Sequence, residues 1–242
     1  MWSPTEAGVE PLADNFLING QHTYDCSVVS TTYNLSAAAA ERPCTGGALY
    51  NTTVRAGEMV RLRLISHASF MSFWFSVDDH PLTIVEIDGV AVAPVTARGV
   101  HVHIGQRYSV LLMANRTAGR YRMRATLPQT CFTPYCPYTS TGLVATGYQA
   151  RAVLRYEGVD PEADLLGVPG NVSNPYGVQN NKARGDVWEG CDDMPFDLPV
   201  PVDEQKAVEV APENMHSVVF QFRQAGPINR IFINRVRFPL PW

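Results

Sequence analysis

The sequence has few charged residues and no long apolar run, and each shortage excludes a class of protein. Only 17% of its 242 residues are Asp, Glu, Lys or Arg, whereas 45% are hydrophobic. Disordered chains show the opposite balance, so disorder throughout is excluded. No apolar stretch reaches the roughly 20 residues that a membrane-spanning helix needs. The net charge is −4 and there is no run of Lys and Arg, which argues against nucleic acid as a partner.

The N-terminus also lacks the basic start and the apolar stretch of a secretory signal peptide. Five cysteines and four Asn-x-Ser/Thr sequons nevertheless indicate a secreted or cell-surface protein from an oxidising compartment. The alternative is a cytosolic protein whose sequons arise by chance. We favour secretion and therefore expect further sequence upstream of this chain. The candidate N-glycosylation sites are Asn34, Asn51, Asn115 and Asn171.

The odd number of cysteines leaves one without a partner inside the chain. Cys26 and Cys44 flank one loop and are predicted to pair, and a disulfide that closes a loop of this size contributes about 3 kcal/mol. Cys131 and Cys136 lie in one short proline-containing loop and form a second candidate pair. Cys191 remains, and we expect its partner in sequence outside this chain.

Glycine and proline, 18 of each, separate many short apolar segments, which is typical of an all-β design. From residue 13 to 156 the predicted strands recur about every 8–12 residues, as in a β-sandwich or barrel. The expected strands are 60–65, 70–77, 82–87, 100–104, 108–114, 121–127 and 152–156.

The pattern weakens over residues 157–214, which are predicted to form a linker with one short helix at 161–166. Alternation then resumes, and the segment IFIN at 231–234 repeats FLIN at 16–19. This repeat suggests a second β domain that begins at about 215. Because so few residues cannot close a sheet, we expect more sequence downstream.

Four segments resemble the second domain of the multicopper oxidases in sequence, order and spacing. They are ADNFLING at 13–20, VRLRLI at 60–65, DHPLTIVEIDGV at 79–90 and GQRYSV at 105–110. The resemblance covers roughly residues 11–156. It implies that 1–12 end a preceding interdomain segment, that 13–156 form a cupredoxin-like Greek-key β-sandwich, and that 215–242 begin the third domain.

In that family, whole enzymes of the laccase, ascorbate oxidase or ferroxidase kind take single electrons from a substrate at a type 1 copper. The resemblance implies a phenol or ferrous iron as substrate and reduction of dioxygen to water at a trinuclear copper cluster. It also implies that the copper ligands lie in the first and third domains, which would be the partners of this one.

The copper-ligand patterns of the family are missing from this sequence. A blue copper site needs two His and a Cys thiolate, and no His follows any cysteine here within about twenty residues. His101 and His103 have the His-x-His form, and their side chains would point the same way on a strand. We interpret them as two solvent-facing histidines, and His80, in a turn, as a structural hydrogen-bonding residue. This chain is therefore expected to bind no copper itself.

Three carboxylates are candidates for a substrate pocket. Glu10 lies in a segment that resembles an iron-binding segment of ferroxidases, and Asp192 and Asp193 lie in the linker near the place of a second acidic residue in such enzymes. The alternative is that all three are ordinary surface carboxylates.

Two further groups of side chains have structural interpretations. The aromatic residues Phe70, Phe73, Trp74 and Phe75 are predicted to fill the sandwich core. The arginines of two strands are predicted to point outward and pair with acids, namely Arg61, Arg63, Arg122 and Arg124.

The preferred hypothesis is therefore a copper-free, pocket-lining segment of a secreted multicopper oxidase, inactive alone, whose residues after about 157 need the other domains to fold. The first alternative is a stand-alone copper-free binding module. A small electron carrier is disfavoured by the missing Cys and His pattern.

Overall fold

The computed structural model describes residues 16–23, 26, 44–68, 72–127, 149–167, 194–195, 197–204, 206, 208–225, 228–234 and 236–237. The chain divides into two compact units. One comprises Asp14–Asp203, and the other comprises Met1–Ala13 together with Glu204–Trp242.

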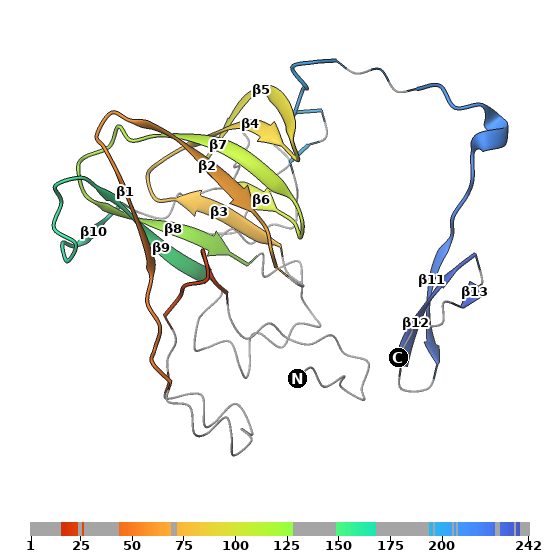
Figure 1. Ribbon diagram of the computed structural model, residues 1–242, viewed down its shortest axis with the longest axis horizontal. Helices are drawn as coiled ribbons and strands as arrows, with labels where there is room; N and C mark the ends of the chain where they lie inside the picture. The colour runs from red at the N-terminus through yellow and green to blue at the C-terminus, as the bar shows by residue number, and fades with distance from the viewer. Residues whose placement is uncertain are drawn as a thin grey trace. The chain divides into compact units, whose positions relative to one another are not determined.

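The larger unit contains two β-sheets (Figure 1). The four-stranded sheet has the order β2-β7-β4-β5 and is antiparallel throughout. Its strands are β2 (Met59–Ile65), β4 (Leu82–Ile87), β5 (Val90–Ala97) and β7 (Arg107–Met113).

The second sheet has six strands in the order β1-β9-β8-β3-β6, with β10 added against β8. The β1–β9 and β10–β8 pairs are parallel and the other pairs are antiparallel. Its strands are β1 (Tyr50–Val54), β3 (Phe73–Val77), β6 (Val100–Val102), β8 (Arg120–Thr126), β9 (Gln149–Tyr156) and β10 (Leu165–Leu166).

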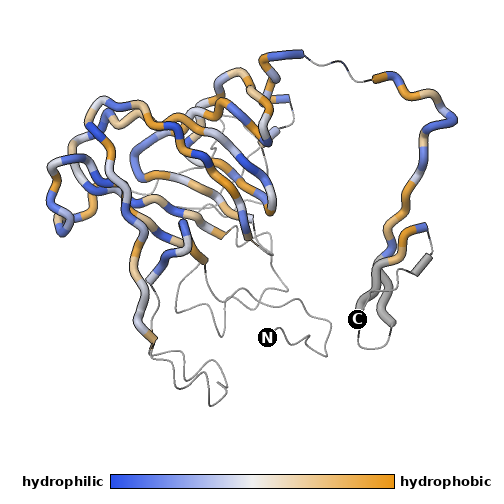
Figure 2. Tube along the Cα trace, in the orientation of Figure 1, coloured by the Kyte–Doolittle hydropathy of each residue, from blue (hydrophilic) through white to orange (hydrophobic). Residues whose placement is uncertain are grey.

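Alternation of hydrophobic and hydrophilic residues along the strands builds the core between these sheets (Figure 2). Leu82, Val110 and Leu112 of one sheet and Leu154 of the other are completely buried. They belong to one hydrophobic cluster that draws on both sheets. The predicted all-β sandwich is thus confirmed, and the described residues contain no α-helix.

The short helix predicted at 161–166 is wrong. The backbone turns at Asp160, which accepts from the amide of Ala163, and Leu165–Leu166 then form β10. Gly167 follows at a φ of +86°. Nucleation of a helix is unfavourable, and so few residues add too few hydrogen bonds to offset it, whereas strand pairing adds hydrogen bonds to a sheet that already exists.

The predicted linker also contacts the sandwich nearer its other end. The amide of Ala93 donates to Val200 O at 2.7 Å, and the amide of Val202 donates to Ala91 O at 2.9 Å. Met194 joins the hydrophobic cluster. The larger compact unit therefore extends to Asp203, and the domain boundary proposed at 156 stays a prediction.

The smaller unit contains an antiparallel three-stranded sheet of β11 (Phe220–Ala225), β12 (Ile228–Ile233) and β13 (Val236–Arg237). A 3₁₀ turn at Pro212–Asn214 precedes it. Asn234, at a φ of +50°, closes the sheet by accepting from the amide of Val219 through its side chain at 2.8 Å. No helix among the described residues is long and apolar enough to cross a membrane.

Candidate functional site

His80 lies in the turn between β3 and β4 and is 2% exposed. Its Nδ1 is 2.7 Å from the carbonyl oxygen of Asp78, so Nδ1 must carry the proton and donate it. Nε2 then accepts from the hydroxyl of Tyr156 at 2.8 Å. The same hydroxyl accepts from the amide of Arg116 at 3.1 Å. The prediction that His80 is a structural hydrogen-bonding residue is confirmed.

This arrangement favours the neutral imidazole. Burial lowers the pKa of His80, and the charge of Arg116 lowers it further, although the hydrogen bond to the Asp78 carbonyl acts in the opposite direction. A proton on Nε2 would also turn an acceptor toward Tyr156 into a donor. The pKa of His22 is lowered as well, first by burial and then by the charge of Arg151.

Asp78 and Arg124 form a buried ion pair beside this turn. Nε of Arg124 donates to one oxygen of Asp78 at 2.7 Å, and Nη2 donates to the other at 2.8 Å. Nη1 donates to Oε1 of Gln149 at 2.8 Å. The two charged side chains are only 7% and 2% exposed.

Arg124 thus pairs with an acid, as predicted, but the expectation that this pair lies in solvent is wrong, because its position on the outer side of the sheet is covered. Arg61 does pair with an acid at a partly exposed position, namely Glu86. Within the described part of the chain, Arg63 and Arg122 form no ion pair with an acidic side chain.

His101 is also buried, at 1% exposure, so its prediction as a solvent-facing histidine is wrong. Strand pairing sets it opposite Trp74, and the two rings stack with centroids 4.7 Å apart. Its Nε2 is 3.0 Å from the hydroxyl oxygen of Ser72. His103 follows the end of β6 and is exposed, as predicted, with its ring centroid 4.5 Å from that of His101.

The described residues do not fit a copper site. Among them, no group of three or more His, Cys, Asp or Glu side chains is placed to hold a metal ion. Cys26 and Cys44 are joined in a disulfide, so neither offers the thiolate of a blue copper site. His80 uses both ring nitrogens within the protein. We assign no chemical step to copper on these residues.

The remaining predicted site residues divide into two groups. The disulfide joins the predicted pair Cys26 and Cys44. Asn51 on β1 and Asn115 in the loop after β7 are exposed, and glycosylation there stays a prediction. The others lie outside the described residues, so their predicted roles stay predictions: Glu10, Asp192, Asp193, Cys131, Cys136, Cys191, Asn34 and Asn171.

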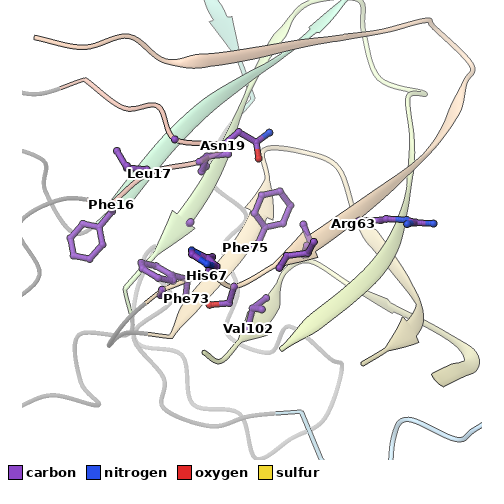
Figure 3. A pocket seen from close by; sticks show the side chains of 15 residues that line it. Phe16, Leu17, Asn19, Arg63, His67, Phe73, Phe75 and Val102 are labelled. Atoms are coloured by element: carbon purple, nitrogen blue, oxygen red, sulfur yellow. The ribbon is translucent and has the colours of Figure 1, made fainter. Parts of the chain in front are cut away.

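The larger unit also contains a pocket with a volume of about 530 Å³ and aromatic side chains in its lining (Figure 3). Phe16, Phe73 and Phe75 line it, and the rings of Phe16 and Phe73 meet edge to face with centroids 5.6 Å apart. The segment that follows β2, residues 66–68, supplies polar lining from Ser66 and His67. Figure 3 shows the side chain of Arg63, also a lining residue, extending away from the aromatic rings.

Sequence reasoning did not find this pocket. It assigned four aromatic residues to the core, which is right for Trp74 at 1% exposure and for Phe75, which packs against the hydrophobic cluster, whereas Phe70 lies outside the described residues. Phe73 and Phe75 are only partly buried and line the pocket. The alternation of side chains along β3 could have predicted this difference, because it places Phe73 and Phe75 on the face opposite Trp74.

Comparison with known proteins agrees with the β-sandwich fold. The model of the multicopper oxidase family matches residues 2–159. Laccase-2 of Botryotinia fuckeliana is 33% identical over 165 residues, which are 66% of this chain and 25% of that protein. Laccase-1 of Pleurotus ostreatus is 29% identical over 202 residues, which are 81% of this chain and 32% of that protein. The chain thus spans about a quarter to a third of the length of these relatives.

Two solved structures are similar in fold. The crystal structure of a laccase from Botrytis aclada has 26% sequence identity and a TM-score of 0.66, and the match covers 95% of this chain and 35% of that one. The crystal structure of Fet3p, described as a multicopper oxidase that functions in iron import, has a TM-score of 0.55. It covers 81% of this chain and 32% of that one, at 16% identity, and therefore shows the fold alone.

Proposed function

Because this chain belongs to the multicopper oxidase family, we propose that it acts as the copper-free second domain of a laccase-like enzyme. On this proposal residues 13–156 are that domain, 157–214 are the linker and 215–242 begin the third domain. The domain holds its neighbours in position and lines the substrate pocket. The first and third cupredoxin domains are its partners, and they carry the copper.

The observation that carries this proposal is the use of histidine and cysteine in the sandwich. Both ring nitrogens of His80 are hydrogen-bonded within the protein, one to the Asp78 carbonyl and the other to the Tyr156 hydroxyl. The ring of His101 stacks on Trp74, and its Nε2 lies within hydrogen-bond distance of the Ser72 hydroxyl. Cys26 and Cys44 form a disulfide with each other. In the described part of the chain, these side chains therefore serve the fold rather than a metal.

For the whole enzyme we propose the one-electron oxidation of a phenol or of ferrous iron. Four such oxidations supply the four electrons that, with four protons, reduce dioxygen to two molecules of water. Similarity to laccases favours phenols. Glu10, Asp192 and Asp193 would favour iron if they face the substrate, because ferrous iron accepts oxygen ligands and its oxidation is helped by negative charge. We further propose that the enzyme is secreted.

The competing function is a stand-alone copper-free binding module. The pocket beside Phe16, Phe73 and Phe75 favours it, because a cavity of this size with aromatic lining and a few polar groups is typical of ligand sites. A module of this kind would bind its ligand without any other domain.

Copper stoichiometry on the purified 242-residue chain tests the proposal. The chain is reconstituted with copper and desalted, and bound metal is measured together with the visible spectrum. We expect no retained copper, no blue band and no oxidation of a phenol or of ferrous iron. One tightly bound copper per chain that is lost in the variant His103→Ala would overturn the copper-free assignment. Turnover by the isolated chain would overturn its predicted inactivity.

A further inference from the structure

The pocket with the aromatic lining lies between the two sheets of the larger unit, since residues of β2 and β3 both line it. Strand pairing sets Phe73 opposite Val102 and Phe75 opposite Ala125, and directly opposed residues share one face of a sheet. Leu64 of β2 reaches the pocket from the other sheet. Phe75 and Leu64 pack against the hydrophobic cluster, so the pocket continues the core at one end of the sandwich.

The lining favours a flat ring. The volume of about 530 Å³ falls within the range of roughly 300–1,000 Å³ that is usual for small-molecule sites. The partly buried rings of Phe73 and Phe75 and the buried ring of Phe16 supply aromatic surface. An aromatic guest gains from edge-to-face or offset contacts beyond simple burial of area, and Phe16 and Phe73 already meet in that way.

Ser66 provides a polar group in this lining. Its amide donates to Gln106 O at 3.1 Å and its carbonyl accepts from Gly105 at 3.0 Å, which fixes the backbone. Its side-chain oxygen is buried and has no hydrogen-bond partner. A buried hydroxyl without a partner costs free energy that a ligand with one donor or acceptor would recover.

Charge limits the ligand further. Arg63 is the only described lining residue with a permanent charge, and its side chain extends away from the rings (Figure 3). No described carboxylate lines the pocket. An ionised ligand would therefore lose its hydration without gaining a counter-ion beside the rings.

From these observations we infer that the pocket binds a small, uncharged aromatic molecule of one or two rings with one hydrogen-bonding group. The ring lies among Phe16, Phe73 and Phe75, and the polar group meets the hydroxyl of Ser66. This inference goes beyond the proposed function, and binding requires neither copper nor turnover.

Indole and indene are matched probes, because they share shape and size and differ in the N–H donor. Binding to the full chain is followed by ligand-detected NMR titration. We expect saturable binding of both, with indole about three- to tenfold tighter, which is the usual effect of one hydrogen bond. Ser66→Ala should bring the two affinities together. Ser76→Ala removes a hydroxyl from the face of β3 that is opposite to the pocket-lining Phe73 and Phe75. It should leave the ratio of the indole and indene affinities unchanged.

Phe75→Trp tests the location by filling the pocket, and we expect at least a tenfold loss of affinity for both probes. Should that variant lose its fold by near-ultraviolet circular dichroism, Ala125→Leu fills the same space from β8. Absence of saturable binding to the unmodified chain would overturn the inference. So would unchanged affinity in a folded, pocket-filled variant. If indole binds more tightly than indene by the same factor in Ser66→Ala as in the unmodified chain, the role proposed for Ser66 is wrong.

Discussion

Some polar residues of this protein are buried at strand positions where the sequence pattern alone predicts exposure to solvent. Arg124 and His101 occupy positions that alternate with core residues, so the sequence indicates an outward direction for both. In the structure each is buried and engaged, Arg124 by Asp78 and His101 by Trp74. Local alternation cannot reveal this, because it reports which face of the sheet a residue is on and not what covers that face.

The first residue-scale prediction concerns acid stability and His80. The folded state lowers the pKa of this imidazole, whereas in the unfolded chain it titrates near its ordinary value of about 6.5. Stability from the neutral imidazole is therefore present above pH 6.5 and is lost as pH falls below it. For one histidine the loss is at most about 1.4 kcal/mol per pH unit.

Urea unfolding at several values between pH 7.5 and pH 5 measures this dependence. In His80→Gln we expect the pH slope of the unfolding free energy to be smaller than in the unmodified chain, by at most one proton. Parallel slopes for His80→Gln and the unmodified chain would contradict the prediction.

The second residue-scale prediction compares two ion pairs. Asp78→Asn leaves Arg124 charged in a covered position, and loss of one partner from a buried pair costs about 3–5 kcal/mol. Glu86→Gln weakens the pair with Arg61, whose side chains are 45% and 33% exposed, and should cost about 1 kcal/mol or less. Urea denaturation of both variants checks the difference. Similar losses in the two would show that the Asp78 pair is not desolvated as the structure indicates.

At the scale of elements, the strands with clean alternation were predicted well. The expected strands at 60–65, 82–87, 108–114 and 121–127 agree with β2, β4, β7 and β8 within one residue at each end. The Asp88-Gly89 signal is confirmed too, because Ile87 pairs with Val90 and both turn residues have positive φ. These elements were predictable because one face of each is buried and the turns require particular residues.

Strand β5 shows why other elements were missed. It runs from Val90 to Ala97 and contains Pro94, which normally argues against a strand. It lies at the end of the sheet order, beside β4 alone among the strands of that sheet. Pro94 falls where the β4–β5 register shifts between Ile84 and Glu86, and such an irregularity tolerates proline because the ladder hydrogen bonds are interrupted there. The place of a strand within its sheet is set by long-range pairing, which no local segment encodes.

The element-scale prediction concerns β10, which Gly167 terminates beside the His80 turn. A Cβ at Gly167 would lie 2.9 Å from Asp79 Oδ2 and 3.1 Å from the Cδ1 of Tyr121. Its φ of +86° is also unfavourable for any other residue. Gly89 has a φ of +91° but open space around it, so it isolates the backbone effect.

We expect Gly89→Ala to cost about 1 kcal/mol from the backbone alone. Gly167→Ala should cost about 1–3 kcal/mol more, because crowding of a packed site adds to the backbone strain. Thermal and urea unfolding of the two variants give the comparison. Equal losses would mean that β10 moves away from β8 without cost.

At the scale of the whole molecule, the sequence placed one change of character at about residue 157, whereas the compact units divide at Asp203 and Glu204. Residues 165–166 pair with β8, and residues 200–202 hydrogen-bond along β5. Irregular segments of this kind carry no periodicity, because their contacts are made through single backbone groups. The prediction that residues after 157 need other domains to fold is therefore best tested separately on each side of this division.

Hydrogen exchange on the isolated chain makes that test. Residues 204, 206, 208–221 and 232–234 are exposed or only partly buried, and Val218, Val219 and Phe220 are exposed apolar residues. Strand β7, in contrast, holds the completely buried Val110 and Leu112. Because protection follows the free energy of local opening, we expect amides of β11 and β12 to exchange at least about 100-fold faster than those of β7.

The amides of Ala93 and Val202, which join the segment 200–202 to β5, provide an internal reference. We expect them to exchange more slowly than those of β11, because they belong to the unit that contains the hydrophobic cluster. Protection of β11 and β12 equal to that of β7 would mean that this sheet is stable without further sequence. It would also remove one reason for assigning residues 215–242 to a domain that is completed elsewhere.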